Sequence, residues 1–352
     1  MDTKKKESFF QSLRREFHEL KAFYITDRQA EDLQRRTWLG RFFVTTFYII
    51  KAFYLRLSPV RRILFIVALF LLFSFNTAEY QSHNVRMQLN LNFWGGVLLI
   101  FLLLLELKDK LLIKDEILAA RAIQEALIPD RTPQIAGFDI FLYYQPMNEV
   151  GGDLIDHIAL NEEKHLLALA DISGKGLSAA LLMSKLQGFI HAFAQDTPFE
   201  QLMEIINQKF FYSVPRKSFA SMLLLMLNKN ASAVRFLNAG HLPPLLWQNG
   251  QFASLPKGGM ALGLAPTQTY RLFEVALNPN DVLVCYSDGL SEAFNKSKEQ
   301  FGEERIKEVI QATGQQSAQM MGEALLQSVR SFIQDQSLSD DLSLIIVKKV
   351  WN

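Results

Sequence analysis

Four short stretches of the sequence place an aspartate beside a turn, next to an apolar run that predicts a strand. The four aspartates are Asp153, Asp171, Asp288 and Asp340. A carboxylate at a strand end is held rigidly and faces a loop opening. Converging carboxylates repel one another unless a cation lies among them. Because the four stretches contain no His or Cys, oxygen-only ligation favours Mg²⁺ or Mn²⁺ over zinc. The pattern indicates a hydrolase with a carboxylate-held metal centre.

The elements that must position these aspartates are strands and helices that begin near Gly137. Alternating or short apolar runs predict strands at 138–144, 165–170, 221–227, 233–237, 282–286 and 342–347. Helical periodicity predicts helices at 177–193, 199–212, 303–312 and 318–333. Because strands and helices do not alternate strictly, the pattern argues against a doubly wound parallel sheet.

The first 62 residues carry twice as many Lys and Arg as Asp and Glu. A basic head is compatible with nucleic acid, but the apolar segments that follow favour an anionic membrane surface. We therefore expect membrane lipid, and no nucleic acid, as a partner. Within this segment, the aromatic run 42–57 contains Lys51, whose charge disfavours a membrane-spanning position. An interfacial helix is the better interpretation.

Two apolar stretches predict a membrane hairpin, from about 60 to 78 and from 91 to 105. The polar residues between them suit a short loop outside the bilayer. Basic residues precede the first stretch and follow the second, so the positive-inside rule places both termini in the cytoplasm. This predicts a multi-pass protein of the inner, or cytoplasmic, membrane. The alternative is a buried helical hairpin of a soluble protein.

Residues 106–128 have a helical pattern that Pro129 ends. Apolar residues cover two sides of this helix, so no single heptad register is clean. One interpretation is a connecting helix packed on the next domain. The other is a signalling helix that pairs with its twin in a homodimer, and the two are compatible.

Six motifs follow one another through the last two thirds of the chain. They are QEALIP at 124–129, EVGGD at 149–153, DISGKGLSAA at 171–180, NAGH at 238–241, SDG at 287–289 and DDLS at 340–343. In order and spacing the region from about Ala119 to Val350 resembles the SpoIIE/RsbU-type bacterial protein phosphatases, part of the wider PPM (protein phosphatase 2C) class.

The resemblance implies an α+β fold, an αββα sandwich of two packed antiparallel sheets with the metal site at one end. It also implies hydrolysis of phosphoserine or phosphothreonine. The expected substrate is a phosphorylated STAS-domain anti-sigma-factor antagonist, which would then capture an anti-sigma factor and free a sigma factor. The alternative function is a catalytically weak membrane scaffold that binds a STAS-type partner.

The resemblance also assigns site residues. Asp153, Asp171, Asp288 and Asp340 would hold two Mn²⁺ or Mg²⁺ ions, and Ile172 would add its backbone carbonyl. Asp341 is the alternative to Asp340 as the last ligand. Further residues near the site, or in contact with phosphate, are Glu149, Gly152, Asp156, Lys175, His241 and Asp341. The turn Ser173–Gly176 lacks the histidine that eukaryotic members place there, so the general acid is unassigned.

These expectations divide the chain into four parts. They are a basic cytoplasmic and interfacial helical segment (1–58), a transmembrane hairpin (59–105), a linker or signalling helix (106–130) and a phosphatase domain (131–352).

Overall fold

The structure is a computed structural model of the chain. It describes residues 37–351 apart from 75–76 and 83–84, together with residues 21, 24, 25, 29 and 33. Most of the predicted basic segment 1–58 therefore lies outside the described residues. The chain divides into two compact units, Met1–Ile113 and Lys114–Asn352. The boundary between them falls within one long helix.

From residue 37 onward, the described part of the first unit contains two helices, a two-stranded hairpin and the start of a further long helix. In order they are α3 (Trp38–Arg56), α4 (Pro59–Phe73), β1 (Thr77–Ser82), β2 (Val85–Asn90) and α5 (Leu91–Leu127). The helix predicted over 42–57 is thus present as part of α3. Arg61 of α4 pairs with Glu106 at 2.9 Å and Asp109 at 2.7 Å on α5. A Cβ on Gly95 would lie 2.9 Å from the Ala68 carbonyl oxygen, so only glycine allows this close approach of α4 and α5.

The predicted membrane hairpin is wrong. In the part of the chain that the structure describes, no helix combines the length and the apolar content that crossing a bilayer requires. Helix α4 has 15 residues, about 22 Å against a hydrocarbon core of about 30 Å, and strand β1 begins inside the predicted first span. The second predicted span, 91–105, is the first part of α5, which continues through charged residues to Leu127. The predicted multi-pass localisation in the inner membrane depended on this hairpin and is therefore also wrong.

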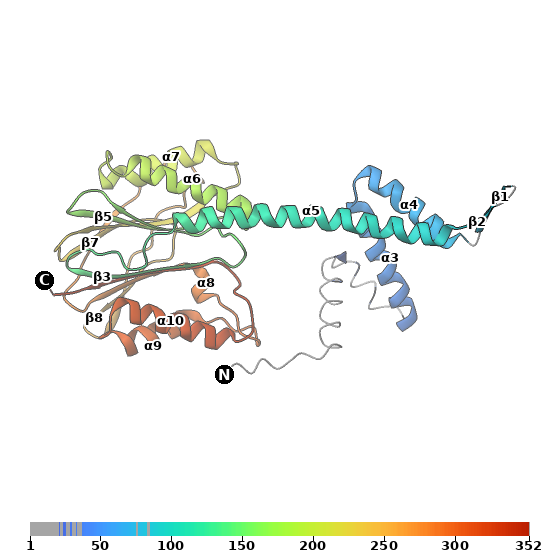
Figure 1. Cartoon of the computed structure of the whole chain (residues 1–352). Coiled ribbons are helices and arrows are strands. Elements are labelled where there is room, and N and C mark those ends of the chain that lie inside the picture. The colour runs from blue at the N-terminus through green and yellow to red at the C-terminus, as the bar shows by residue number, and fades with distance from the viewer. Residues whose placement is uncertain are drawn as a thin grey trace. The chain divides into compact units, whose positions relative to one another are not determined.

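The second unit is a sandwich of two five-stranded antiparallel sheets covered by helices on both outer faces (Figure 1). One sheet has the order β10-β7-β6-β5-β4, and the other has the order β3-β12-β11-β8-β9. The strands are β3 (Phe138–Gln145), β4 (Leu154–Ala159), β5 (Lys164–Ile172), β6 (Ala220–Asn228), β7 (Ala233–Ala239), β8 (Leu245–Gln248), β9 (Gln251–Ser254), β10 (Leu272–Ala276), β11 (Val282–Tyr286) and β12 (Leu342–Lys349). The predicted αββα sandwich is confirmed.

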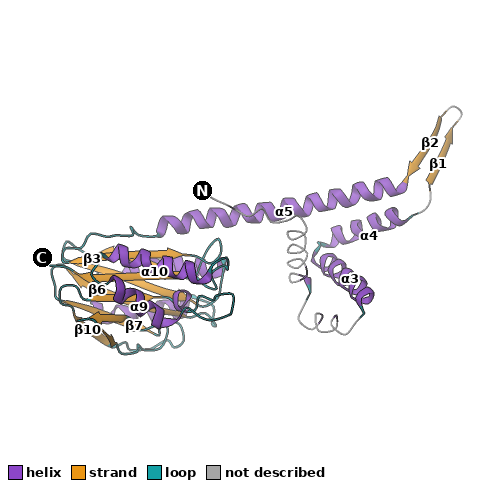
Figure 2. Ribbon diagram, turned by 90° about the horizontal axis from the view of Figure 1, so that it is seen from below, coloured by secondary structure: helices purple, strands orange, loops and turns teal. Residues whose placement is uncertain are grey.

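Helices α6 (Leu177–Phe193) and α7 (Phe199–Ser213) cover the first sheet, whereas α9 (Gly302–Thr313) and α10 (Ala318–Ile333) cover the second. A short helix, α8 (Asp288–Ser291), follows β11. Figure 1 shows the packed strands between these two layers of helices, and Figure 2, seen from below, shows α9 and α10 in front of the strands. All four helices predicted for this region are present with closely similar bounds.

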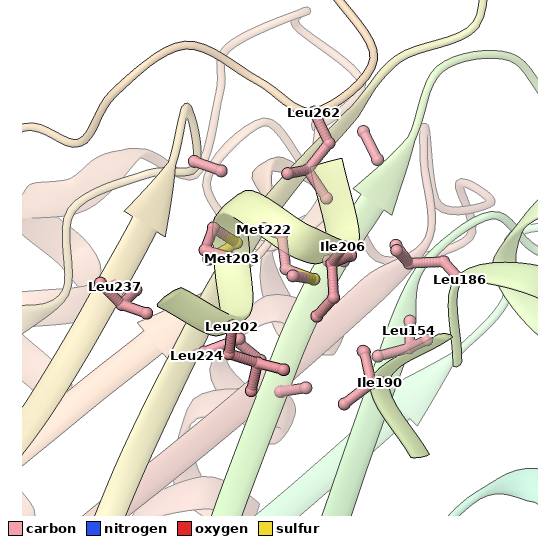
Figure 3. Close-up of a cluster of buried hydrophobic side chains, with 14 of the residues drawn as sticks. Leu154, Leu186, Ile190, Leu202, Met203, Ile206, Met222, Leu224, Leu237 and Leu262 are labelled. Carbon is pink, nitrogen blue, oxygen red and sulfur yellow. The ribbon is translucent and has the colours of Figure 1, made fainter. Parts of the chain in front are cut away.

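Three apolar layers hold the sandwich together. Strand β5 shows why: Leu166 and Ala168 pack towards α6 and α7, whereas Leu167 and Leu169 pack between the sheets. This period-two alternation buries both faces of a central strand, so its sequence is continuously apolar. Figure 3 shows the layer under α6 and α7, where side chains from both helices meet those of β4, β6 and β7. Each buried leucine contributes roughly 1.5–3 kcal/mol.

Strand register brings the predicted site residues to one end of the sandwich. Leu154 pairs with Ala170, which places Asp153 and Asp171 side by side at one end of β4 and β5 in the first sheet. In the second sheet Tyr286 pairs with Leu344, so Asp288 lies near the start of β12. The segment before β12 carries Asp340. The fold therefore delivers all four aspartates to one end without requiring them to be close in sequence.

Candidate metal centre

Asp153 directly precedes β4, and its carboxyl group is buried. The Ser343 hydroxyl donates a hydrogen bond to Asp153 Oδ2 at 2.7 Å. Burial raises the pKa of the Asp153 carboxyl well above its usual range, and the Asp171 carboxylate raises it further. A cation beside this group would stabilise its charged form.

Asp171 and Asp288 bring carboxylates from the two sheets together. The pKa of Asp171 is raised to about 6, first by burial and then by the carboxylates of Asp288 and Asp340. The pKa of Asp288, at the start of α8, is raised by burial and then by Asp340. Asp171 lies on β5 of one sheet, whereas Asp288 and Asp340 flank strands of the other. The mutual repulsion of these groups is the electrostatic condition that a divalent cation relieves.

The two adjacent acids Asp340 and Asp341 have different environments. Asp341 is buried, and its carboxylate accepts hydrogen bonds from the backbone N–H of Met147 at 2.7 Å and of Gly152 at 2.6 Å. Asp340 is partly exposed and pairs with Lys175 Nζ at 2.7 Å. Asp341 is thus engaged in fixing the 147–152 loop, whereas Asp340 faces Asp288. This difference favours Asp340 over Asp341 as the ligand.

Two glycines permit these close approaches. A Cβ on Gly151 would overlap the Asp341 carboxylate and the Tyr144 hydroxyl. A Cβ on Gly289 would overlap the backbone carbonyl of Asp341. A side chain at either position would therefore push the loops that carry Asp153 and Asp288 away from Asp341.

Two serines that the sequence analysis did not single out fasten β11 to β12. Ser287 Oγ donates to the Asp341 carbonyl oxygen at 3.1 Å and accepts from the Ser343 N–H at 2.9 Å. Ser343 Oγ in turn donates to Asp153. Both serines lie within the SDG and DDLS motifs, but their partners are distant in sequence. The motifs alone therefore did not reveal these contacts.

Gln124, near the end of α5, makes a two-way contact with the loop that carries Asp153. Its side-chain Nε2 donates to the Gly151 carbonyl oxygen at 2.8 Å, and its Oε1 accepts from the Gly151 N–H at 3.1 Å. Gln124 is buried. The sequence placed this residue in a family motif without assigning it a role. The structure shows that α5 is bonded directly to the loop that contains Asp153.

The residues predicted to lie near the centre divide into two groups. Glu149, Gly152 and Lys175 lie on the loops around the aspartates: Glu149 pairs with Arg121 at 2.9 Å, and a Cβ on Gly152 would lie 3.1 Å from the Ile172 carbonyl oxygen. Ile172 ends β5 immediately beside Asp171.

Asp156 and His241 have other contacts. The buried carboxylate of Asp156 accepts from His191 at 2.7 Å and from Gln187 at 3.1 Å, both on α6. His241 is buried, its Nδ1 accepts from the Leu242 N–H at 2.8 Å, and burial lowers its pKa to about 4. These contacts are structural: they tie β4 to α6 and hold the turn after β7.

The donor chemistry fits a hard divalent cation, but the side chains do not form a closed cage. Among the described residues, no group of three or more His, Cys, Asp or Glu side chains converges tightly enough to hold a metal ion. The donors on hand are carboxylates that raise one another's pKa, beside the exposed ammonium of Lys175. Repulsion spreads carboxylates that a bound cation would draw together.

Comparisons with known proteins agree with this geometry. The family model described as Stage II sporulation protein E (SpoIIE) matches residues 161–350. Phosphoserine phosphatase RsbU of Bacillus subtilis (strain 168) is 28% identical over 246 residues, which cover 67% of this chain and 71% of RsbU. Protein IcfG of Synechocystis sp. (strain ATCC 27184 / PCC 6803 / Kazusa) is 23% identical over 261 residues, 66% of this chain but only 41% of IcfG.

Solved structures share the fold. The SiaA-PP2C domain of Pseudomonas aeruginosa superposes with a TM-score of 0.58 at 19% identity, over 68% of this chain and 98% of that domain. The PP2C phosphatase domain of SpoIIE from Bacillus subtilis, with a fragment of its regulatory domain, gives 0.52 at 16% identity, over 62% and 61% of the respective chains.

The two-sheet sandwich with acidic loops at one end defines a PP2C-like serine/threonine phosphatase. Within that class, the chain belongs to the SpoIIE family.

Proposed function

We propose that this protein is a divalent-metal-dependent phosphoserine and phosphothreonine protein phosphatase whose substrate is a phosphorylated STAS-domain anti-sigma-factor antagonist. The observation that supports the metal assignment is the placement of Asp171, Asp288 and Asp340 at one end of the sandwich, where Asp288 and Asp340 raise the pKa of Asp171 and Asp340 raises that of Asp288. Residues 131–352 would form the phosphatase domain. The partner-switching role is supported by the family resemblance and by the similarity to a protein named phosphoserine phosphatase RsbU.

In this proposal Asp153, Asp171, Asp288 and Asp340 hold two Mn²⁺ or Mg²⁺ ions, with the Ile172 carbonyl as a further ligand. Such ions supply charge that clamps phosphoryl oxygens and lowers the pKa of a bound water. Ser343 orients the Asp153 carboxylate, and Asp341 holds the loop before it.

Lys175 is exposed and pairs with Asp340; in this proposal its ammonium contacts a phosphate oxygen when that ion pair opens. The turn Ser173–Gly176 offers no histidine, so the proposal assigns no side chain as the general acid, and water would be the proton donor to the leaving serine oxygen. Cys285 is excluded as a nucleophile, because it is buried in β11 and burial raises the pKa of its thiol.

We also propose a homodimer through α5. Leu107, Leu111 and Leu118 on this helix are each at least 41% exposed, and apolar residues at such spacing suit a second copy of the helix. The last turns of α5 reach Gly151 through Gln124. A change in the pairing of the helices would therefore be felt at the loop that carries Asp153.

The test is hydrolysis of p-nitrophenyl phosphate by the full chain in Mn²⁺, compared with the variants Asp171→Ala and Asp288→Ala. Loss of a metal ligand removes several kcal/mol of transition-state stabilisation, so we expect at least a ~100-fold lower kcat/KM. The alternative is a scaffold that binds a STAS-type partner without turnover. Equal, negligible rates in the parent and both variants would favour that scaffold.

A further inference from the structure

The turn between α7 and β6 is fastened to the end of the sandwich that carries the aspartates. Ser218 N–H donates to the Pro215 carbonyl oxygen at 2.8 Å, which closes the turn. The Ser173 N–H donates to the Phe219 carbonyl oxygen, and the Phe219 N–H donates to Ser173 Oγ, both at 2.9 Å. Ser173 lies two residues beyond Asp171. The turn is therefore held beside the metal centre by short bonds.

This turn presents cations that no other described group engages. Arg216 and Lys217 are exposed, and neither has a hydrogen bond or ion pair with any residue that the structure describes. Two other cations near the aspartates are engaged: Lys175, on the loop after β5, pairs with Asp340, and Arg121, on α5, pairs with Glu149. Unpaired positive charge at a centre rich in carboxylates is available to an anionic partner.

A third such cation lies on the loop before β10. Lys257 is exposed and, within the described part of the chain, also lacks a polar partner. Its loop is bonded to the end of β7, because the Gly259 N–H donates to the Asn238 carbonyl oxygen at 2.9 Å. The end of β7 lies at the same end of the first sheet as Ile172 and Ala220. The two loops that carry Arg216, Lys217 and Lys257 are thus anchored at the end of the first sheet where Asp171 lies.

Two exposed apolar side chains lie on the same segments of the chain. Phe219 is 42% exposed and Leu264 is 53% exposed. Ala220 and Leu262 exchange backbone hydrogen bonds at 3.1 and 2.8 Å, so the 262–264 segment runs beside the turn. We call the surface formed by Arg216, Lys217, Phe219, Lys257 and Leu264 the docking rim.

We propose that the docking rim binds the protein substrate, and that it selects phosphoserine segments flanked by acidic residues. The inference rests on the proposed phosphatase function and adds a substrate preference to it. Flanking carboxylates would meet Arg216, Lys217 and Lys257, whereas an apolar substrate side chain would cover Phe219 and Leu264. Charge complementarity of this kind sets association rate and specificity, and basic segments would be repelled by the same residues.

The experiment compares three phosphoserine peptides that differ only in their flanks, which are acidic, neutral or basic. The full chain is assayed in Mn²⁺ at low salt, with p-nitrophenyl phosphate as a substrate without flanks. The variants are Lys217→Glu and the double variant Arg216→Glu/Lys217→Glu. The matched control is Lys229→Glu, because Lys229 is exposed and follows β6 at the opposite end of the sheet.

We expect the parent to prefer the acidic over the neutral peptide by roughly 3–10-fold in kcat/KM, a preference that high salt should reduce. Lys217→Glu should weaken the preference and the double variant should reverse it, while Lys229→Glu retains it. The rate on p-nitrophenyl phosphate should change by less than about twofold, because that substrate does not reach the rim.

Two results would overturn the docking rim. One is an unchanged peptide preference in the double variant. The other is an equal loss on p-nitrophenyl phosphate and on all peptides, which would assign these residues a structural role. A parent that hydrolyses p-nitrophenyl phosphate but shows no preference among the peptides would refute the inference alone. A parent inactive on every substrate would refute the proposed function beneath it.

Discussion

At the scale of single residues, hydrogen bonds to the acidic groups matter as much as the acids themselves. Asp153 is buried, and its carboxylate accepts a hydrogen bond from the Ser343 hydroxyl. Asp341 accepts from two backbone N–H groups and thereby sets the path of the loop that carries Asp153. Each of these donors lies far in sequence from the aspartate that it bonds, so the geometry of the centre depends on the fold.

Ser343→Ala should weaken metal binding. Loss of the hydroxyl leaves the buried Asp153 carboxylate with one donor fewer, which costs about 1–3 kcal/mol for its charged form. We expect Mn²⁺ affinity, measured by calorimetry, to fall by roughly tenfold or more. Ser339→Ala is the matched control, because Ser339 Oγ donates only to the Glu292 carbonyl oxygen on the surface. Equal Mn²⁺ affinity in both variants would show that the Ser343 hydroxyl does not support metal binding.

His241 should make stability depend on pH. Its pKa is lowered to about 4 by burial, whereas an unfolded histidine titrates near 6.5. Between these values the unfolded chain binds a proton that the folded chain does not, so the folded state loses stability as pH falls from about 6.5 towards 4, by at most about 1.4 kcal/mol per pH unit.

Urea unfolding of the parent and His241→Gln across this range tests the assignment. The variant should show the shallower decline of unfolding free energy with falling pH. Parallel curves would mean that His241 is accessible to protons in the folded protein.

At the scale of elements, α5 connects the two units, and its last turns contact the loop 147–153, which carries Asp153. Gln124 makes both of its amide contacts with Gly151. Gln124→Ala should therefore free the 147–153 loop and lower kcat/KM by at least about tenfold, in line with a buried amide pair of 1–3 kcal/mol. Lys114→Ala, a change at an exposed position on the same helix, should leave activity near the parent value. An unaffected rate in Gln124→Ala would show that the contact does not position the centre.

Helix phase gives a second prediction for α5. One alanine inserted after Lys114 rotates the following residues by about 100°, whereas seven nearly restore the phase. If paired α5 helices transmit a signal, one inserted residue should change phosphatase activity and seven should largely restore it. The mass of the particle by light scattering checks the dimer in each case. Parent-like activity in both insertions would leave α5 as a tether only.

Most helices and strands could be predicted from the sequence, but some elements in each unit could not. Helices α6, α7, α9 and α10 were predicted because each repeats its apolar residues at the helical period over three or more turns. Strands β4, β8, β9 and β10 were missed: β4 carries Asp156 and His157 among its apolar residues, and the others have only four or five residues. Such short strands gain their stability from neighbours rather than from local pattern.

The membrane hairpin failed for a related reason. The apolar run 63–75 is the same for a span and for a helix that packs on a partner, and periodicity alone does not separate them. The Arg61 pairing with Glu106 and Asp109 joins two segments more than forty residues apart, which a local pattern cannot reveal. The site aspartates were predictable because each adjoins a turn, whereas the contacts of Gln124 and Ser343 were not, because their partners arise from the fold.

At the scale of the whole molecule, the sandwich brings carboxylates together that no single sheet could provide. Asp153 and Asp171 lie at one end of neighbouring strands of the first sheet, and Asp288 and Asp340 flank strands β11 and β12 of the second. Holding four acids at one end is costly unless a cation neutralises them. The architecture and the proposed chemistry therefore depend on the same feature: strand ends of the two packed sheets lie at one end of the sandwich.

The most direct test is release of phosphate from a phosphoserine peptide by the full chain, measured with Mn²⁺, after removal of metal by EDTA, and after Mn²⁺ is restored. We predict hydrolysis with Mn²⁺, loss of nearly all activity in EDTA and recovery on addition of excess Mn²⁺, because the aspartates supply no nucleophile without a bound cation. Full activity in EDTA would contradict the metal centre.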